Sequence, residues 1–151
     1  MMVGAIHRIA RAVGVNRPNL LVAVVFLTSC ATTSTHQFAL PDAHWQTQAG
    51  QLLYRNVKTA VIGDVIVRYS QTGDFELTFS KGPGVTLLTL RQDAKFAEIM
   101  GSMAGIGWSG AVERAPQQLR GWLELRDAIA RSKDRRKVTH ASGSETFVFR
   151  F

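Results

Sequence analysis

The chain has 151 residues and a formal net charge of +7, and 46% of its residues are hydrophobic against 19% that are charged. This length suits about one domain, and the composition permits a packed core and argues against wholesale disorder. The single cysteine excludes an internal disulfide, a zinc site made of several cysteines and a cysteine-ligated iron–sulfur cluster. Four histidines, His7, His36, His44 and His140, lie too far apart in the sequence to form a metal motif. We therefore expect neither a metal ion nor another cofactor.

The N-terminal residues have the organisation of a secretory signal peptide. Arg8, Arg11 and Arg17 precede an unbroken apolar run over residues 20–27, and no acidic residue occurs before that run. The run is shorter than the roughly 20 apolar residues that a helix needs to span a membrane. A basic segment, a short apolar segment and then small residues are typical of a signal that directs export and is then removed. We predict that residues 1–29 are such a signal peptide.

The end of this segment, Leu27-Thr28-Ser29-Cys30, resembles the lipobox of bacterial lipoproteins. The resemblance implies that the chain is cut before Cys30 and that this cysteine carries a diacylglyceryl group, usually with a further acyl chain on its amine. Two acyl chains are sufficient for stable anchoring to a membrane. The alternative is an ordinary signal peptide followed by a coincidental cysteine, although the only cysteine of the chain lies where a lipobox requires it.

The residues that follow Cys30 indicate a tether and a destination. Residues 30–44 are mostly small and polar around Pro41, which predicts a lipidated cysteine and a flexible tether before a domain over 45–151. In well-studied lipoprotein sorting systems an Asp after the cysteine retains the protein in the inner membrane. Ala31 stands there in this chain. We therefore expect a lipid-anchored protein of the bacterial outer membrane whose domain faces the periplasm.

The positive charge of the exported chain is concentrated in one segment. Loss of the three signal-peptide arginines leaves 15 of the 18 basic residues against 11 acidic ones, and residues 131–137 alone account for the remaining +4. We predict that Arg135, Arg136 and Lys137 contact anionic headgroups, with the solvated end of a helix as the alternative. No aromatic residue interleaves with this segment to stack on bases, so we do not expect nucleic acid as a partner.

From about residue 50 the sequence is mostly of β type, and one helix interrupts it. Alternating or β-branched segments, separated by turns, predict strands over residues 61–70, 75–80, 85–92, 94–100 and 146–151. Pro116 then suits the first turn of a helix whose apolar face carries Leu119, Trp122 and Leu123. We predict a mostly β (α+β) domain: a curved antiparallel sheet or half-barrel of about six or seven strands, with one long amphipathic helix near residues 116–131.

The apolar faces of these elements are the candidate binding site. One helix covers only part of such a sheet, and uncovered apolar surface inside a curved sheet would form a lipid groove. Ordinary core packing under the helix is the alternative for each residue. The predicted groove residues are Leu77, Phe79, Leu88 and Leu90 on the sheet and Leu119, Trp122 and Leu123 on the helix.

We find no catalytic motif, and we expect no enzymatic activity. The glycine-rich residues 101–107 lack both a Gly-Lys-Ser/Thr ending and the dinucleotide-binding spacing. His44 and His140 have no obvious nucleophile beside them in the sequence, and Asp64 and Asp74 would be a carboxylate pair only if the fold brought them together. A tethered enzyme built from such scattered residues is therefore the weakest of three hypotheses.

The domain resembles the LolA/LolB-like group of lipoprotein carriers and outer-membrane lipoproteins. The cues, in chain order, are Gly50-Gln51-Leu52-Leu53-Tyr54-Arg55, Gly63-Asp64-Val65, Phe79-Ser80-Lys81-Gly82-Pro83, Trp108-Ser109-Gly110, Pro116 and Gly121-Trp122-Leu123-Glu124-Leu125. The resemblance implies a strongly curved antiparallel half-barrel with helices as a lid. It also implies an apolar cavity that receives the acyl chains of lipoproteins or of other lipids.

Together these features predict a membrane-anchored lipoprotein that binds or carries a lipid or acyl chain, with a role in lipoprotein or lipid localisation at the outer membrane. The alternative is a structural or adaptor lipoprotein with a filled core, which docks an envelope protein. A packed interior with an exposed apolar patch would favour the adaptor.

The predicted anchor is tested by Cys30→Ser. Because lipidation of this sulfur precedes cleavage in lipoproteins, the variant should accumulate as an unprocessed precursor without lipid. Mass spectrometry and membrane fractionation of the expressed chain measure both properties. A variant that still fractionates as a mature, membrane-bound form would show that Cys30 is not the anchor.

Overall fold

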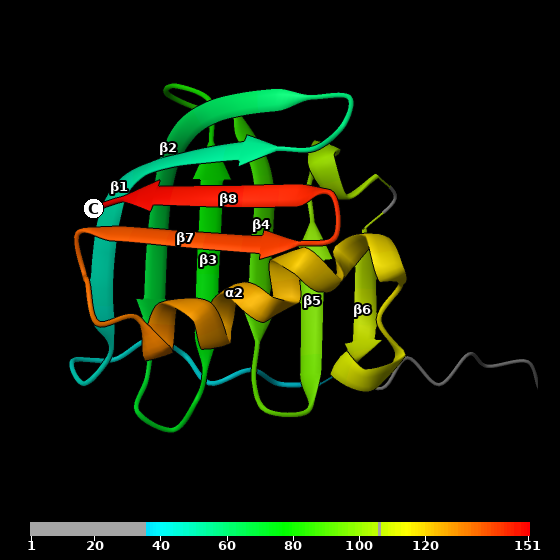
Figure 1. Ribbon diagram of the computed structural model, residues 1–151. Coiled ribbons are helices and arrows are strands. Elements are labelled where there is room, and N and C mark those ends of the chain that lie inside the picture. Colours follow the sequence, from blue (N-terminus) through cyan, green and yellow to red (C-terminus); the bar gives the residue numbers. More distant parts are fainter. Residues whose placement is uncertain (1–35, 106) are drawn as a thin grey trace, which may run out of the picture. The chain divides into compact units, whose positions relative to one another are not determined.

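Eight antiparallel strands form one sheet in the order β6-β5-β4-β3-β2-β1-β8-β7 (Figure 1). The computed structural model describes residues 36–105 and 107–151, so the predicted signal peptide and lipobox lie outside the described residues. The strands are β1 Gln46–Arg55, β2 Ala60–Tyr69, β3 Phe75–Ser80, β4 Thr86–Gln92, β5 Phe96–Met100, β6 Trp108–Ala111, β7 Lys137–Ser142 and β8 Glu145–Arg150. The predicted class, a curved antiparallel sheet with one helix, is confirmed, and the sheet has eight strands where six or seven were predicted.

The strands alternate between an apolar concave face and a mixed convex face. On β3, Phe75, Leu77 and Phe79 are buried, and Leu77 and Phe79 lie opposite Leu90 and Leu88 of β4. Side chains two residues apart point to the same face of a strand, so the alternation places all five in one interior. Four of the predicted groove residues, Leu77, Phe79, Leu88 and Leu90, lie in this packed interior.

Two glycines allow neighbouring strands to approach where the sheet bends. A Cβ atom added at Gly63 would lie 2.2 Å from the Ser80 carbonyl oxygen, beside the register shift between Phe79 and Ser80. A Cβ atom at Gly50 would lie 2.1 Å from the Arg150 carbonyl oxygen. Both separations are far inside van der Waals contact, so only glycine fits. β-bulges and glycines of this kind curve a sheet.

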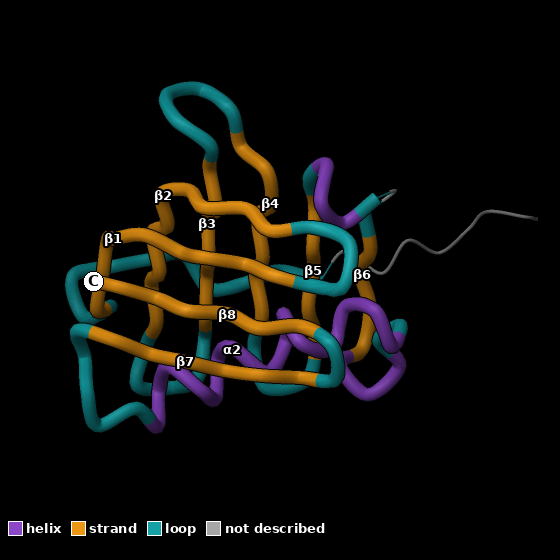
Figure 2. Tube along the Cα trace, turned by 45° about the horizontal axis from the view of Figure 1, so that its top comes forward, coloured by secondary structure: helices purple, strands orange, loops and turns teal. Residues whose placement is uncertain are grey.

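The helix α2, Arg120–Arg131, lies against the concave face (Figures 1 and 2). A 3₁₀ turn over Gln117–Leu119 leads directly into it, so the helical segment matches the predicted 116–131 closely. Its apolar face buries Trp122, Leu123 and Leu125 against the sheet. The edge strands β6 and β7 do not pair with each other, so the sheet remains open.

The compact unit begins at His36, within the segment predicted as a tether over 30–44. The His36 ring stacks on Phe96 with a centroid separation of 4.4 Å, and Phe38 contacts His36 and lies under the Arg91 guanidinium at 5.1 Å. His36 also bonds to the Asp93 carboxylate over 2.5 Å. Residues 36–38 therefore pack on the convex face of β4 and β5. No helix among residues 36–105 and 107–151 is long and apolar enough to cross a membrane.

The packing of the interior predicts the cost of truncating it. Leu88 is 0% exposed, whereas Leu40 is 78% exposed, so the two allow one chemical change to be compared in two environments. Leu88→Ala should lower the free energy of unfolding by about 2–5 kcal/mol because it leaves a cavity. Leu40→Ala should change it by less than about 0.5 kcal/mol.

Urea denaturation of residues 36–151 measures both changes, since every buried apolar residue of the described core lies in this unit. Equal losses for Leu88→Ala and Leu40→Ala would contradict this packing.

Candidate functional site

The predicted groove residues come together in a single apolar cluster. Leu77, Phe79, Leu88, Leu90, Leu119, Trp122 and Leu123 are all at most 5% exposed and belong to it. The structure thus brings all seven side chains to one place. It also shows that side chains of α2 occupy the space between them. An acyl chain would have to take the place of the helix face.

Trp122 is the centre of this interior. Its ring centroid lies 5.1 Å from that of Tyr54 on β1, 4.9 Å from that of Phe147 on β8 and 6.3 Å from that of Phe79 on β3. Tyr54 and Phe147 are register partners across β1 and β8, which places both rings under the helix. Sequence reasoning did not include Tyr54 or Phe147 among the site residues.

Few polar contacts hold α2 to the sheet. The Arg126 Nη1 donates to the Asp93 carbonyl oxygen over 2.9 Å, and Glu124 bonds to His140 of β7 over 3.0 Å. Arg126, which interrupts the apolar helix face in the sequence, is therefore bound to the turn between β4 and β5. The remaining attachment of α2 to the sheet is apolar contact.

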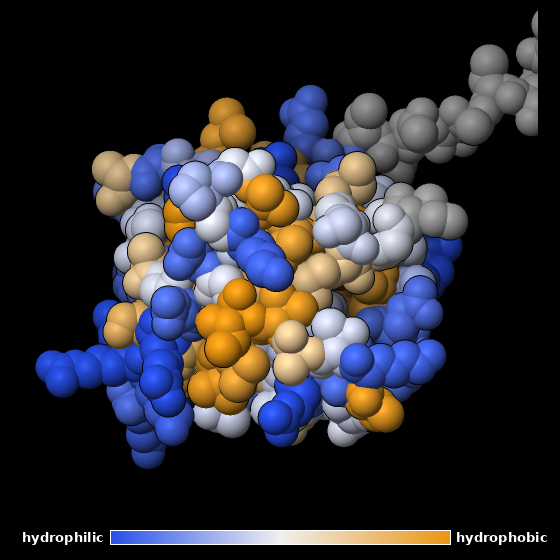
Figure 3. All heavy atoms as spheres, turned by 90° about the horizontal axis from the view of Figure 1, so that it is seen from above, coloured by the Kyte–Doolittle hydropathy of each residue, from blue (hydrophilic) through white to orange (hydrophobic). Residues whose placement is uncertain are grey.

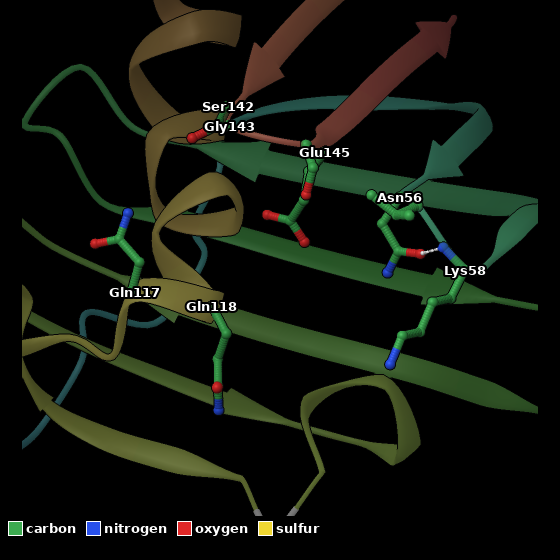
Figure 4. Close-up of a pocket in the computed structure, with 9 residues that line it drawn as sticks. Asn56, Lys58, Gln117, Gln118, Ser142, Gly143 and Glu145 are labelled. Atoms are coloured by element: carbon green, nitrogen blue, oxygen red, sulfur yellow. Dashed lines mark hydrogen bonds between the residues drawn. The ribbon is translucent and has the colours of Figure 1, made fainter.

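A polar cavity of about 660 Å³ lies at the start of α2 (Figure 4). We call it the polar cavity; residues 56–58, 117–118 and 142–145 line it. These come from the β1–β2 turn, the 3₁₀ turn before α2 and the β7–β8 turn. Figure 4 shows the Glu145 carboxylate and the Lys58 side chain directed into the space between these segments.

Tyr54 links the polar cavity to the apolar interior. Its hydroxyl donates to the Glu145 Oε1 over 2.7 Å and accepts from the Asn56 Nδ2 over 3.0 Å, while its ring contacts Trp122. Burial, and then the hydrogen bond to Glu145, raise the pKa of Tyr54 to about 12. An ionised phenolate would be both desolvated and repelled by the carboxylate. The hydroxyl therefore stays a donor that fixes one oxygen of Glu145.

The basic segment lies at the opposite end of α2 from the polar cavity. Arg135, Arg136 and Lys137 are exposed, and the Asp134 carboxylate accepts hydrogen bonds from the backbone amides of the last two. Arg135 also lines a separate cavity of about 260 Å³ beside Ile129. The predicted headgroup residues therefore face solvent, and they are separate from the predicted groove residues, which are buried.

The residues considered for catalysis remain dispersed. Asp64 lies in the middle of β2, on its convex face, whereas Asp74 follows the end of that strand and accepts hydrogen bonds from Ser70 and Thr72. His140 bonds to Glu124, and the His44 amide is bonded to Asp42. Within the described parts of the chain, no three histidine, cysteine or carboxylate side chains cluster as a metal site would require.

Comparison with known proteins adds no relative. No protein-family model matches the chain, and no curated protein matches its sequence. The resemblance to the LolA/LolB-like group therefore rests on the sequence cues alone.

The link between Tyr54 and Glu145 predicts a pH dependence. Because the folded-state pKa of Tyr54 lies above the ordinary value of 10, the free energy of unfolding should fall as the pH rises from about 10 through 12. The chain has two tyrosines, so Tyr69→Phe leaves Tyr54 as the only source of tyrosinate absorbance.

In Tyr69→Phe the absorbance midpoint should lie near pH 12, the pKa that burial and Glu145 give Tyr54. Glu145→Gln in the same background should lower the midpoint, because it removes the carboxylate charge. A midpoint near the ordinary value of 10 in Tyr69→Phe would contradict the buried bond.

Proposed function

We propose that this protein is a lipid-anchored bacterial envelope protein that binds a lipid or acyl chain inside its curved sheet. One observation carries the proposal: a single helix covers the apolar concave face of an open sheet, and Tyr54 joins this interior to residues that line a polar cavity. An amphipathic ligand needs an apolar space next to a small set of polar groups. The proposed role is hydrophobic transfer or sensing of a lipid, without covalent chemistry.

Lipid entry requires α2 to leave the sheet. The free energy gained by burying an acyl chain is comparable with the free energy lost when the helix face leaves. Removing Trp122, Leu123, Leu125 and Ile129 from the interior would cost about 6–12 kcal/mol, at about 1.5–3 kcal/mol for each side chain. An acyl chain that buries about ten CH₂ groups would return about 8 kcal/mol. The two terms are of the same order, so a lipid would replace the helix face without a large net cost.

The proposed anchoring uses two attachments to a membrane. The diacylglyceryl group on Cys30 would hold the chain in the outer membrane, with the domain in the periplasm. Arg135, Arg136 and Lys137 would contact anionic headgroups, each at about 1 kcal/mol near such a surface. Their exposure supports this role, and the position of the segment at the end of α2 would keep the helix near the membrane surface.

A filled core favours a second candidate, an adaptor that docks another envelope protein. On the convex face, Ile62 of β2 lies opposite Leu53 of β1, which lies opposite Val148 of β8. Ile62 is 62% exposed, and Figure 3 shows hydrophobic side chains gathered over this part of the sheet. Such a row suits a protein contact. An adaptor of this kind would not take up lipid.

A disulfide that fixes α2 to β7 separates the two candidates. A Cβ atom at Gly121 would lie 3.3 Å from the Ser142 Cβ, close to the roughly 3.5–4.5 Å between Cβ atoms of a disulfide. Gly121→Cys combined with Ser142→Cys should therefore form a bond on oxidation. Uptake of a fluorescent fatty acid should be lost in the oxidised protein and restored by reduction, because only the reduced form releases the helix.

A Cβ atom at Gly121 would also lie 2.3 Å from the Glu145 Oε2, so the carboxylate must turn aside in any Gly121→Cys protein. The single variants Gly121→Cys and Ser142→Cys, treated with the same oxidant, carry the same local changes without the cross-link, and both should keep uptake of the fatty acid. Failure of the unaltered protein to take up fatty acid or phospholipid would reject the lipid-binding function and favour the adaptor.

A further inference from the structure

The polar cavity contains one acidic and one basic side chain that do not pair with each other. In the described part of the chain, Lys58 takes part in no ion pair and Glu145 in none either. The Glu145 Oε1 is occupied by the Tyr54 hydroxyl, and its Oε2 has no hydrogen-bond donor. Both residues line the same cavity of about 660 Å³, where the Glu145 Oε2 lies beside Gly121 in the first turn of α2 and remains available to a ligand.

Both charges are carried by segments that the structure holds in place. The Asn56 Oδ1 accepts hydrogen bonds from the backbone amides of Lys58 and Thr59, over 2.9 and 2.7 Å, which fixes the turn that bears Lys58 (Figure 4). Glu145 is fixed through Tyr54, whose ring packs on Trp122. A ligand would therefore meet a carboxylate that Tyr54 holds and an ammonium at the end of an exposed side chain on a fixed turn. Such preorganisation reduces the ordering cost of binding.

The remaining polar groups of the cavity are neutral hydrogen-bonding groups. Gln117 and Gln118 contribute amides, and Ser142 and Ser144 contribute hydroxyls. None of these four side chains has a hydrogen-bond partner among the described residues. A phosphate at Lys58 would find further donors here, since amide nitrogens and hydroxyls donate to phosphate oxygens.

The charge pattern selects the class of ligand. A purely anionic group would be attracted by Lys58 and repelled by Glu145. A purely cationic group would be attracted by Glu145 and repelled by Lys58. A neutral polyol would leave both charges unpaired. A zwitterion with a phosphate and a primary ammonium satisfies both, because each of its charges meets the opposite charge of the protein.

We propose that the polar cavity binds the phosphoethanolamine headgroup of a phospholipid, with the ammonium at the Glu145 carboxylate and the phosphate at Lys58. This inference rests on the proposed function, because the acyl chains would pass Tyr54 into the interior that α2 covers. Tyr54 lies between the two regions: its hydroxyl bonds to Asn56 and Glu145, which line the cavity, and its ring packs against Trp122. The headgroup would thus lie at one end of the ligand path.

The test is native mass spectrometry of the full chain released from detergent micelles. The chain is offered equimolar phosphatidylethanolamine and phosphatidylglycerol with identical acyl chains, and the bound lipids are identified by mass. The unaltered protein should prefer phosphatidylethanolamine by about tenfold, since its ammonium forms a charge-assisted bond that phosphatidylglycerol lacks.

Two charge variants have different expected signatures. Glu145→Gln keeps the shape of the side chain and an acceptor for Tyr54, and it should abolish the preference by removing the partner of the ammonium. Lys58→Met should weaken the binding of both lipids by a similar factor, about tenfold, because each lipid has the same phosphate. Glu113→Gln and Lys95→Met change exposed charges that do not line the cavity and should leave binding unchanged.

Each outcome bears on one proposal. Binding of both lipids without preference, unaltered in Glu145→Gln, would overturn the headgroup assignment while the lipid-binding function stands. Glycerophosphoethanolamine that binds as tightly as the intact lipid would overturn the assignment of the cavity to a phospholipid, by showing a site for the free headgroup. Absence of any bound lipid in the unaltered protein would reject the proposed function itself.

Discussion

The need to cover one apolar concave face governs this structure. The strands β1 to β5 and β8 present buried aliphatic or aromatic side chains to the same side of the sheet, and water must be excluded from them. The edges β6 and β7 do not pair, so the sheet does not close into a barrel that would cover its own interior. One helix, α2, performs this covering, and Trp122 supplies its largest buried side chain. The stability of the sheet and access to its interior therefore depend on a single contact surface.

Local sequence patterns predicted the elements that have a clear inside and outside. Strict alternation in Phe75, Leu77 and Phe79 predicted β3, and helical spacing around Trp122 predicted α2, because in both cases burial fixes the period. The strand β7 escaped prediction for a physical reason. Only Val138 of its inward residues is apolar, while His140 bonds to Glu124 of α2 and Ser142 lines the polar cavity. A strand whose inner face borders polar groups has no hydrophobic alternation to detect.

The candidate site was predictable only in its apolar part. Periodicity places the groove residues on common faces, and the fold then joins those faces. The bond between Tyr54 and Glu145 joins residues 91 positions apart, through the register of β1 on β8, and no local spacing encodes that register. The packing of His36 on the sheet was not predicted either, because its stacking on Phe96 depends on a contact between segments distant in the sequence.

The position of Glu145 connects the polar cavity to the helix. A Cβ atom at Gly121 would lie 2.3 Å from the Glu145 Oε2 and 3.2 Å from the Phe147 ring, so the absence of a side chain at residue 121 leaves room for the carboxylate beside α2. The carboxylate oxygen that lacks a hydrogen-bond donor therefore lies against the first turn of the helix. A cation that draws this oxygen into the cavity would change the surface on which α2 rests. Conversely, a helix that leaves the sheet would free the carboxylate to turn toward a ligand. Ligand binding at the polar end and the packing of α2 on the sheet therefore involve the same carboxylate.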